Sequence, residues 1–255
     1  MLIVFLAPSC FAAEPLAHAE SKANLTILID ANLMLPVAKI ARLYAKTGHT
    51  PLTLVVKNSA EVQEEIGQGL EAHVVLTANT ELIDQLAEQG LTDVSSSRAV
   101  ARTQLALVAS NQLENREVLV KHLSFAATLY ATPDVPVYLD APLSDANERA
   151  QALMQGYPFS PQLGARARPS VSHAILLASL AQDPGLALML ATDAVGQPGL
   201  TVLNVLPDSL SKPVQYTVVV LASESMNEAR QFAQFLTTPP AQAIFSQFGF
   251  QPPGE

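Results

Sequence analysis

Short β-rich runs alternate with helical patterns along most of the chain, and this alternation limits the fold more than any other feature. Residues Leu25–Ile29 are typical of a buried strand, and apolar residues then recur at helical spacing from Leu33 to Tyr44. Two similar units follow, with strands expected at Leu52–Val56 and Val74–Thr77. Three strand–helix units in a row predict a parallel sheet with helices on both faces.

The second half of the chain continues the pattern. Strands are expected at residues 105–109, 135–139, 186–190 and 216–221, helices at residues 144–154 and 172–181, and a loop at residues 166–170. Capping-box sequences at residues 58–61 and 225–228 mark two further helix starts, and Pro239 suits the first position of a last helix. Two α/β lobes that exchange strands and a single doubly wound domain both fit this order.

Composition excludes several classes of partner. The chain has 255 residues, and its 49% apolar content is enough for a core and excludes global disorder. Lys and Arg number 14 against 23 Asp and Glu, a net charge of −9, which argues against nucleic acid and anionic membrane surfaces. Taken alone, that charge also argues against an anionic ligand. The single cysteine, Cys10, excludes an internal disulfide framework and a cysteine-based zinc site.

The first 19 residues have features of an export signal. A mostly apolar stretch from Leu2 to Ala13 is shorter than the ~20 residues of a membrane span, and residues 17–19 match a small-x-small cleavage pattern. We therefore expect a signal peptide at residues 1–19, with residues 10–12 as a second cleavage candidate, and a periplasmic protein. The stretch lacks Lys and Arg, so a mobile apolar N-terminus on a cytosolic protein is the alternative. Residues 7–10 are a poor lipobox, and no lipid anchor is expected.

Motifs of known catalytic sites are missing from the sequence. It contains no phosphate-binding glycine motif, nucleophile elbow or zinc-protease motif, and no two histidines stand at metal-ligand spacing. A triad such as Ser59, His73 and Asp30 has neither an elbow nor an oxyanion signature. We therefore expect no enzyme, no metal and no cofactor.

Small polar residues stand where strands are followed by helices: Asn32, Ser59, Asp145 and Ser172. In open α/β sheets, ligands bind outside the carboxyl ends of the strands, where helix N-termini offer free N–H groups and a partial positive charge. Several converging N-termini would make an anion site without Lys or Arg. The alternative is that each residue only caps its own helix.

Several short segments, in this order and spacing, resemble the periplasmic molybdate-binding proteins of ABC importers. They are LTIL at 25–28, IGQG at 66–69 with TAN at 77–79, ATDA at 191–194, YTVVV at 216–220, and AQAIF with FGF at 241–250. The resemblance implies a two-lobed type II periplasmic-binding fold, each lobe a mostly parallel sheet flanked by helices. It places lobe 1 at residues 22–102 and 216–255 and lobe 2 at residues 103–215.

The function that the resemblance implies is transport. Members of this family are periplasmic solute-binding proteins that hold a tetrahedral oxyanion, molybdate or tungstate, between two lobes through hydroxyls and backbone N–H groups. The resemblance also implies an ABC permease in the inner membrane as the partner and a monomeric protein.

The ligand residues of the family fall on candidate positions of this chain. Two family serines fall on Asn32 and Ser59, and the backbone donors fall on Asp145 or Ala146 and on Ser172. The family's tyrosine falls on Leu190, which has no donor, and Asn32 can replace a hydroxyl through its NH₂ group. The neighbouring Asp30 and Asn58 complete the candidate set.

Asp145 is the main departure from an anion site. A carboxylate ~4 Å from a bound anion costs about 4 kcal/mol at an effective dielectric constant of 20, unless Asp145 and Glu148 form a capping box and face their own helix. Two other functions therefore stay open. One is the same fold with a metal cation or a polar organic solute, for which Asp30, Asn32 and Asp145 offer oxygen ligands. The other is a periplasmic interaction or sensor protein that has lost oxyanion binding.

Overall fold

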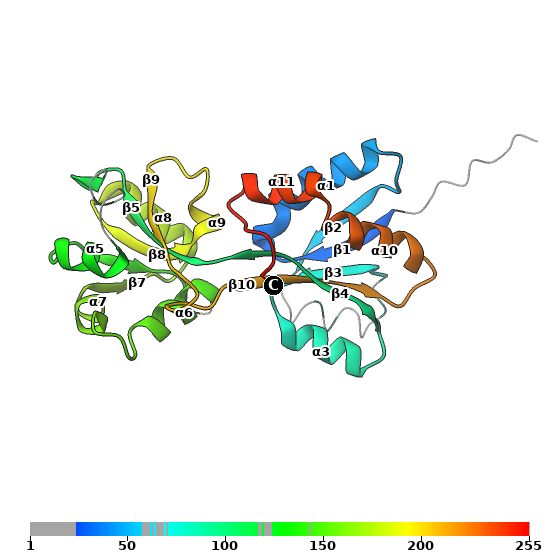
Figure 1. Cartoon of the computed structure of the whole chain (residues 1–255), viewed down its shortest axis with the longest axis horizontal. Helices are drawn as coiled ribbons and strands as arrows, with labels where there is room; N and C mark the ends of the chain where they lie inside the picture. Colours follow the sequence, from blue (N-terminus) through cyan, green and yellow to red (C-terminus); the bar gives the residue numbers. More distant parts are fainter. Residues whose placement is uncertain are drawn as a thin grey trace, which may run out of the picture.

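The chain forms two lobes, each built on a five-stranded sheet flanked by helices (Figure 1). The structure, a computed structural model, describes residues 24–254 apart from residues 58–61, 63, 65–68, 70, 117–118, 120–123 and 143. The predicted two-lobed α/β fold class is confirmed, and the single doubly wound domain is not what the chain forms.

Lobe 1 combines the N-terminal part of the chain with its C-terminal end. Its elements are β1 (Leu25–Ile29), η1 (Ala31–Leu33), α1 (Met34–Lys46), β2 (Leu52–Val56), β3 (Val74–Thr77), α3 (Thr80–Glu88), β4 (Thr92–Thr103), β10 (Val214–Leu221), α10 (Met226–Phe235) and α11 (Pro239–Gln247). The strand order is β2-β1-β3-β10-β4.

Lobe 2 comes from the middle of the chain. Its elements are β5 (Leu105–Ser110), α5 (Phe125–Ala131), β6 (Val137–Leu139), α6 (Asp145–Leu153), α7 (Ser160–Arg166), β7 (Ala167–Pro169), α8 (His173–Gln182), β8 (Leu186–Leu190), α9 (Ala191–Ala194) and β9 (Leu200–Val205). The strand order is β7-β6-β8-β5-β9.

Both sheets are mixed, with two parallel and two antiparallel pairings each. In lobe 1, β1 pairs in parallel with β2 and β3, while β10 lies antiparallel between β3 and β4. In lobe 2, β6 pairs in parallel with β7 and β8, while β5 lies antiparallel between β8 and β9. Four strands of each sheet therefore run in one direction, as predicted for a parallel sheet. The fifth strand, β10 in lobe 1 and β5 in lobe 2, runs in the opposite direction.

Most of the expected elements are present. The strands expected at residues 186–190 and 216–221 match β8 and β10, and α11 begins at Pro239 as predicted. The loop predicted at residues 166–170 is wrong, because residues Ala167–Pro169 form the edge strand β7, a position that tolerates a proline. The capping box predicted at residues 225–228 is half right: Ser225 precedes α10 but its side chain makes no cap hydrogen bond.

Successive buried side chains of a strand point to opposite faces of the sheet, and helices cover both faces. In β1, Ile27 and Ile29 pack with α1, α10 and α11, whereas Leu28 packs on the opposite face with α3. In lobe 2 the same alternation places one set of β5 and β8 side chains against α6 and the other set against α8. This two-sided burial explains why the inner strands are rich in apolar residues.

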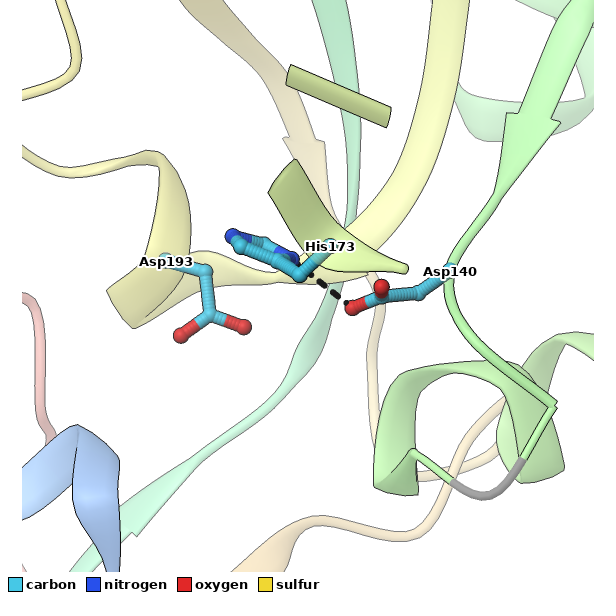
Figure 2. A group of neighbouring side chains, drawn as sticks. All are labelled: Asp140, His173 and Asp193. Atoms are coloured by element: carbon cyan, nitrogen blue, oxygen red, sulfur yellow. Dashed lines mark hydrogen bonds and ion pairs between the residues drawn. The ribbon is translucent and has the colours of Figure 1, made fainter. Parts of the chain in front are cut away.

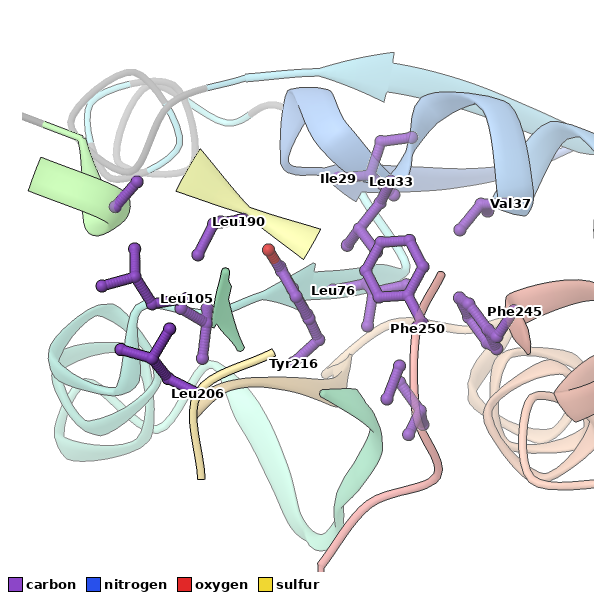
Figure 3. Packing of buried hydrophobic residues seen from close by; sticks show 14 of the residues in the cluster. Ile29, Leu33, Val37, Leu76, Leu105, Leu190, Leu206, Tyr216, Phe245 and Phe250 are labelled. Carbon is purple, nitrogen blue, oxygen red and sulfur yellow. The ribbon is translucent and has the colours of Figure 1, made fainter. Parts of the chain in front are cut away.

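Tyr216 and the C-terminal tail fill the region where the lobes join. The Tyr216 ring packs against Phe250 with centroids 5.5 Å apart, and Phe250 packs against Phe245 (Figure 3). Gln251 pairs with Arg102 through two backbone hydrogen bonds of 2.8 and 2.9 Å. The tail therefore braces the end of β4, just before the chain enters lobe 2.

The chain crosses between the lobes twice, between β4 and β5 and between β9 and β10 (Figure 1). These crossings support the predicted division into residues 22–102 with 216–255 and residues 103–215, which stays a prediction. The predicted signal peptide, residues 1–19, lies outside the described residues, as does the capping box at residues 58–61. Within the described part of the chain, no helix has the length and hydrophobicity to cross a membrane.

Candidate functional site

A cleft of about 1290 Å³ separates the two lobes. Its walls are residues at the carboxyl ends of the inner strands and at the helix starts that follow them. Asp30 follows β1, Thr77 ends β3, Asp140 follows β6 and Leu190 ends β8, and all four line the cleft. This is the edge of an α/β sheet at which ligands bind.

The N-termini of three helices lie at the cleft. Asn79 caps α3, Ser144 caps α6 and Ser172 caps α8, each by accepting a hydrogen bond from the backbone N–H three residues on, at 3.0 to 3.3 Å. The residues that follow these caps, Thr80, Asp145 and His173 among them, line the cleft. Each N-terminus adds a partial positive charge to the cleft wall.

Asp30 in lobe 1 is held by neutral donors. Its carboxylate accepts hydrogen bonds from the Thr77 hydroxyl at 3.0 and 3.1 Å and from the Ala78 N–H at 2.8 Å. Burial raises the pKa of Asp30, although these hydrogen bonds favour its charged form. The carboxylate thus ties the end of β1 to the end of β3.

Asp140 in lobe 2 has a titratable partner instead. Its Oδ2 lies 3.0 Å from Nδ1 of His173, and its Oδ1 accepts a hydrogen bond from the Ala141 N–H at 2.7 Å. Burial opposes ionisation of Asp140, but these two bonds outweigh it and lower its pKa. The hydrogen bond to Asp140 raises the pKa of His173.

Asp193 stands beside this pair (Figure 2). It belongs to α9, directly after β8, and burial raises its pKa to about 6. One donor atom from each of Asp140, His173 and Asp193 lies within 4.8 Å of the other two. The three side chains come from three separate elements, which is why sequence spacing does not reveal them.

Asn32 and Tyr216 meet at the lobe 1 side of the cleft. The Asn32 amide NH₂ donates to the Tyr216 hydroxyl, and its buried Oδ1 has no partner among the described residues. Burial strongly raises the pKa of Tyr216, so its hydroxyl stays protonated. Tyr216 is not predicted as a site residue because it lies inside a buried strand, where the sequence pattern indicates only a role in the sheet.

Asp145 lines the cleft but does not cap its helix. Ser144 is the N-cap, so the capping box proposed for Asp145 and Glu148 is wrong. Asp145 occupies the first helical position and pairs with Arg149 one turn on, with Oδ1 and Nη1 3.2 Å apart. Its charge is therefore partly compensated by Arg149, which is not among the residues that line the cleft.

Five of the eight predicted site residues line the cleft: Asp30, Asn32, Asp145, Ala146 and Leu190. Ser172 caps α8 beside it, while Asn58 and Ser59 lie outside the described residues. Asp140, His173 and Asp193 are not among the site residues predicted from the sequence. A signal for Asp140 does exist, because it follows its strand directly, as Asp30 follows β1.

Carboxylates dominate the charge of the cleft. Asp30, Glu81, Asp140, Asp145, Glu148 and Asp193 line it, together with Lys57 and His173. The excess of acids seen in the whole chain is therefore also present at the site. An anion in this cleft has to be bound by N–H and O–H donors, or with the help of a cation.

Comparison with known proteins identifies the family. Residues 25–251 match the family model described as bacterial extracellular solute-binding protein. The molybdate-binding protein ModA of Escherichia coli strain K12 is 22% identical over 232 residues, which cover 89% of this chain and 88% of that protein.

Solved structures share the fold. The substrate binding domain of a putative molybdenum ABC transporter from Clostridium difficile superposes with a TM-score of 0.78 at 20% identity, covering 91% of this chain and 99% of that one. The periplasmic molybdate-binding protein of Azotobacter vinelandii superposes with a TM-score of 0.64 at 17% identity, covering 91% and 100%. Because the family model spans both lobes from β1 to beyond α11, the chain belongs to the family of bacterial extracellular solute-binding proteins.

Proposed function

We propose that this protein is the solute-binding component of an ABC importer and that it binds a small tetrahedral oxyanion, molybdate or tungstate, in the cleft. The observation that carries the proposal is the convergence of the N-termini of α3, α6 and α8 on one cleft between two lobes. Helix N-termini bind oxyanions through backbone N–H groups without any lysine or arginine. The similarity to ModA and to the other molybdate proteins supports the choice of anion.

The proposed contacts combine side-chain and backbone donors. Asn32 and Ser59 provide side-chain donors, and Asp145 or Ala146 and Ser172 provide backbone N–H groups. Leu190 contributes an apolar wall in place of a hydroxyl donor. Asp30, which ties the ends of β1 and β3 together beside these donors, and Asn58 complete the proposed set.

Transport also requires export and a membrane partner. We propose that residues 1–19 direct the chain to the periplasm, that the mature protein is a monomer, and that closure of the lobes around the solute presents it to a permease. The family is one of solute-binding proteins, and we propose that the cleft binds its solute without changing it.

Thermal unfolding with a panel of anions tests the proposal. An oxyanion at 100 times its dissociation constant stabilises the fold by about 2.7 kcal/mol. Molybdate or tungstate should raise the melting temperature, and sulfate and phosphate should raise it less. No shift with molybdate or tungstate, whether or not a divalent metal is present, would contradict the proposal.

Asp145→Asn tests where the anion lies. Removing this carboxylate from the cleft wall should tighten molybdate binding, because it removes a repulsive charge from the start of α6. Glu88→Gln is the matched control, since it removes one charge from the exposed end of α3, outside the lining of the cleft. Calorimetric titration should show tighter binding for the first variant and no change for the second. Equal affinities in both variants would place the anion away from α6.

A further inference from the structure

We propose that Asp140, His173 and Asp193 form a binding site for a divalent transition-metal cation, such as Zn²⁺, on the lobe 2 wall of the cleft. This goes beyond the proposed function, because the cation is a second ligand beside the oxyanion. The chemical class follows from the donor set. One imidazole and two carboxylates suit Zn²⁺ and its neighbours, whereas Mg²⁺ and Ca²⁺ favour oxygen donors alone.

The three donors are close enough to share one ion. Tetrahedral zinc holds nitrogen and oxygen donors at about 2.0–2.2 Å, which separates them from one another by roughly 3.3–3.6 Å. His173 Nδ1 and Asp140 Oδ2 are 3.0 Å apart, and all three donor atoms lie within 4.8 Å of one another. The Asp193 carboxylate stands beside the pair formed by His173 and Asp140 (Figure 2).

The surroundings hold the donors in place. Asp140 is 3% exposed and its Oδ1 is fixed by the Ala141 N–H, so only Oδ2 is turned toward His173. His173 begins α8 and Asp193 lies in α9, and both helices pack on the same sheet. All three residues belong to lobe 2, so a cation can bind before the lobes close.

A cation here also changes the electrostatics of the cleft. Two carboxylates that would repel an oxyanion become metal ligands, and the site gains two positive charges. Three protein ligands leave a coordination position for water or for an oxygen of an anion. The metal site therefore offers a way for an acidic cleft to hold an oxyanion.

Isothermal titration of metal-free, tag-free protein with Zn²⁺, without any oxyanion, tests the site. We expect one equivalent to bind, and Co²⁺ to give the visible absorption bands of a coordinated ion. His173→Gln and Asp193→Asn should each weaken zinc binding by at least the roughly 10- to 100-fold that loss of an outer-shell partner of a metal ligand costs. His173→Gln keeps a hydrogen-bond donor for Asp140, and unchanged thermal unfolding of each metal-free variant shows that it folds.

Glu148→Gln is the matched control, since it removes one exposed carboxylate from the same cleft without touching the three donors. Its zinc affinity should stay within about threefold of the wild-type value. Equal losses in Glu148→Gln and Asp193→Asn would show attraction by the acidic cleft in general and would overturn the site. So would the lack of saturable zinc binding by the wild-type protein.

The two ligands can be tested apart. Loss of zinc binding with molybdate binding intact would refute the metal site alone. Zinc binding without any molybdate or tungstate binding, at zero or saturating zinc, would refute the proposed oxyanion and leave the cation site standing.

Discussion

The sheets of the two lobes have the same strand order, but the side chains at the edges that line the cleft have different partners. In each lobe an aspartate directly follows the central parallel strand, Asp30 after β1 and Asp140 after β6. In lobe 1 the partners are the Thr77 hydroxyl and the Ala78 N–H, which carry no charge. In lobe 2 the partner is His173, with Asp193 beside it.

This difference shows how one topology supports two roles. Asp30 has fixed neutral donors and acts as a structural tie between neighbouring strands. Asp140 is hydrogen-bonded to His173, a side chain that can ligate metal, and the carboxylate of Asp193 lies beside them. Equivalent positions in the two sheets therefore predict the same backbone geometry but not the same function.

Matched isosteric variants of the two aspartates test this difference most strongly. Asp140→Asn should weaken zinc binding by at least the roughly 100-fold that loss of an outer-shell partner can cost, because it replaces a charged ligand by a neutral amide. Asp30→Asn should leave zinc affinity within about threefold. Titration calorimetry on both metal-free proteins measures the contrast, and similar losses in both would remove the distinction between the lobes.

Asp30→Ala tests the structural role in lobe 1. It leaves the Thr77 hydroxyl, which is buried, and the Ala78 N–H without their acceptor, and we expect a loss of about 2 kcal/mol in the free energy of unfolding. Chemical denaturation of the metal-free protein measures it. The Asp30→Asn variant, whose amide can still accept and donate, should lose much less. A cost near zero for Asp30→Ala would mean that the tie is dispensable.

Coupling between the two ligands tests whether the lobes act together. Saturating zinc should tighten molybdate binding at least about tenfold, equivalent to ~1.4 kcal/mol, because the cation neutralises carboxylates that face the anion. The effect should vanish in His173→Gln. Reciprocal titrations measure it, and by linkage molybdate must tighten zinc binding by the same factor. Independent affinities would separate the two sites energetically.

The pH dependence of stability gives the smallest expected effect. Burial raises the pKa of Asp30 above its unfolded value, so folding favours its protonated form. The stability from this group is complete below the unfolded pKa and is lost as the pH rises through the folded pKa. Asp30→Asn does not titrate, so its melting temperature should rise relative to that of the wild-type protein as the pH rises from about 3.9, the ordinary pKa of an aspartate, through the folded pKa of Asp30. A gap that is constant or shrinks would contradict the raised pKa.

Sequence patterns predict the strand–helix units well, but they predict neither β4 nor its pairing with β10. The inner strands β1, β3 and β8 are almost entirely apolar because both faces are covered, and such runs are visible in the sequence. β4 carries polar side chains, and its pairing with β10 joins segments more than 100 residues apart. Local periodicity holds no information about such pairing.

The site could be predicted only where it follows local rules. Asp30, Asn32 and Asp145 stand at strand ends or helix starts, so topology alone places them at the cleft. The group of Asp140, His173 and Asp193 depends on the packing of α8 and α9 against one sheet, which no spacing rule shows. The position of Asp145 in its helix was also not predictable from the sequence. Its spacing to Glu148 suggests that Asp145 is the N-cap, but Ser144 is the N-cap of α6.

Crystals grown with zinc and molybdate test the central claim most directly, through anomalous diffraction at the absorption edges of both metals. We expect a molybdenum peak between the lobes near the N-terminus of α6 and a zinc peak between Asp140, His173 and Asp193. A molybdenum peak outside the cleft, or a cleft without molybdenum at saturating concentration, would contradict the binding of an oxyanion between the two lobes.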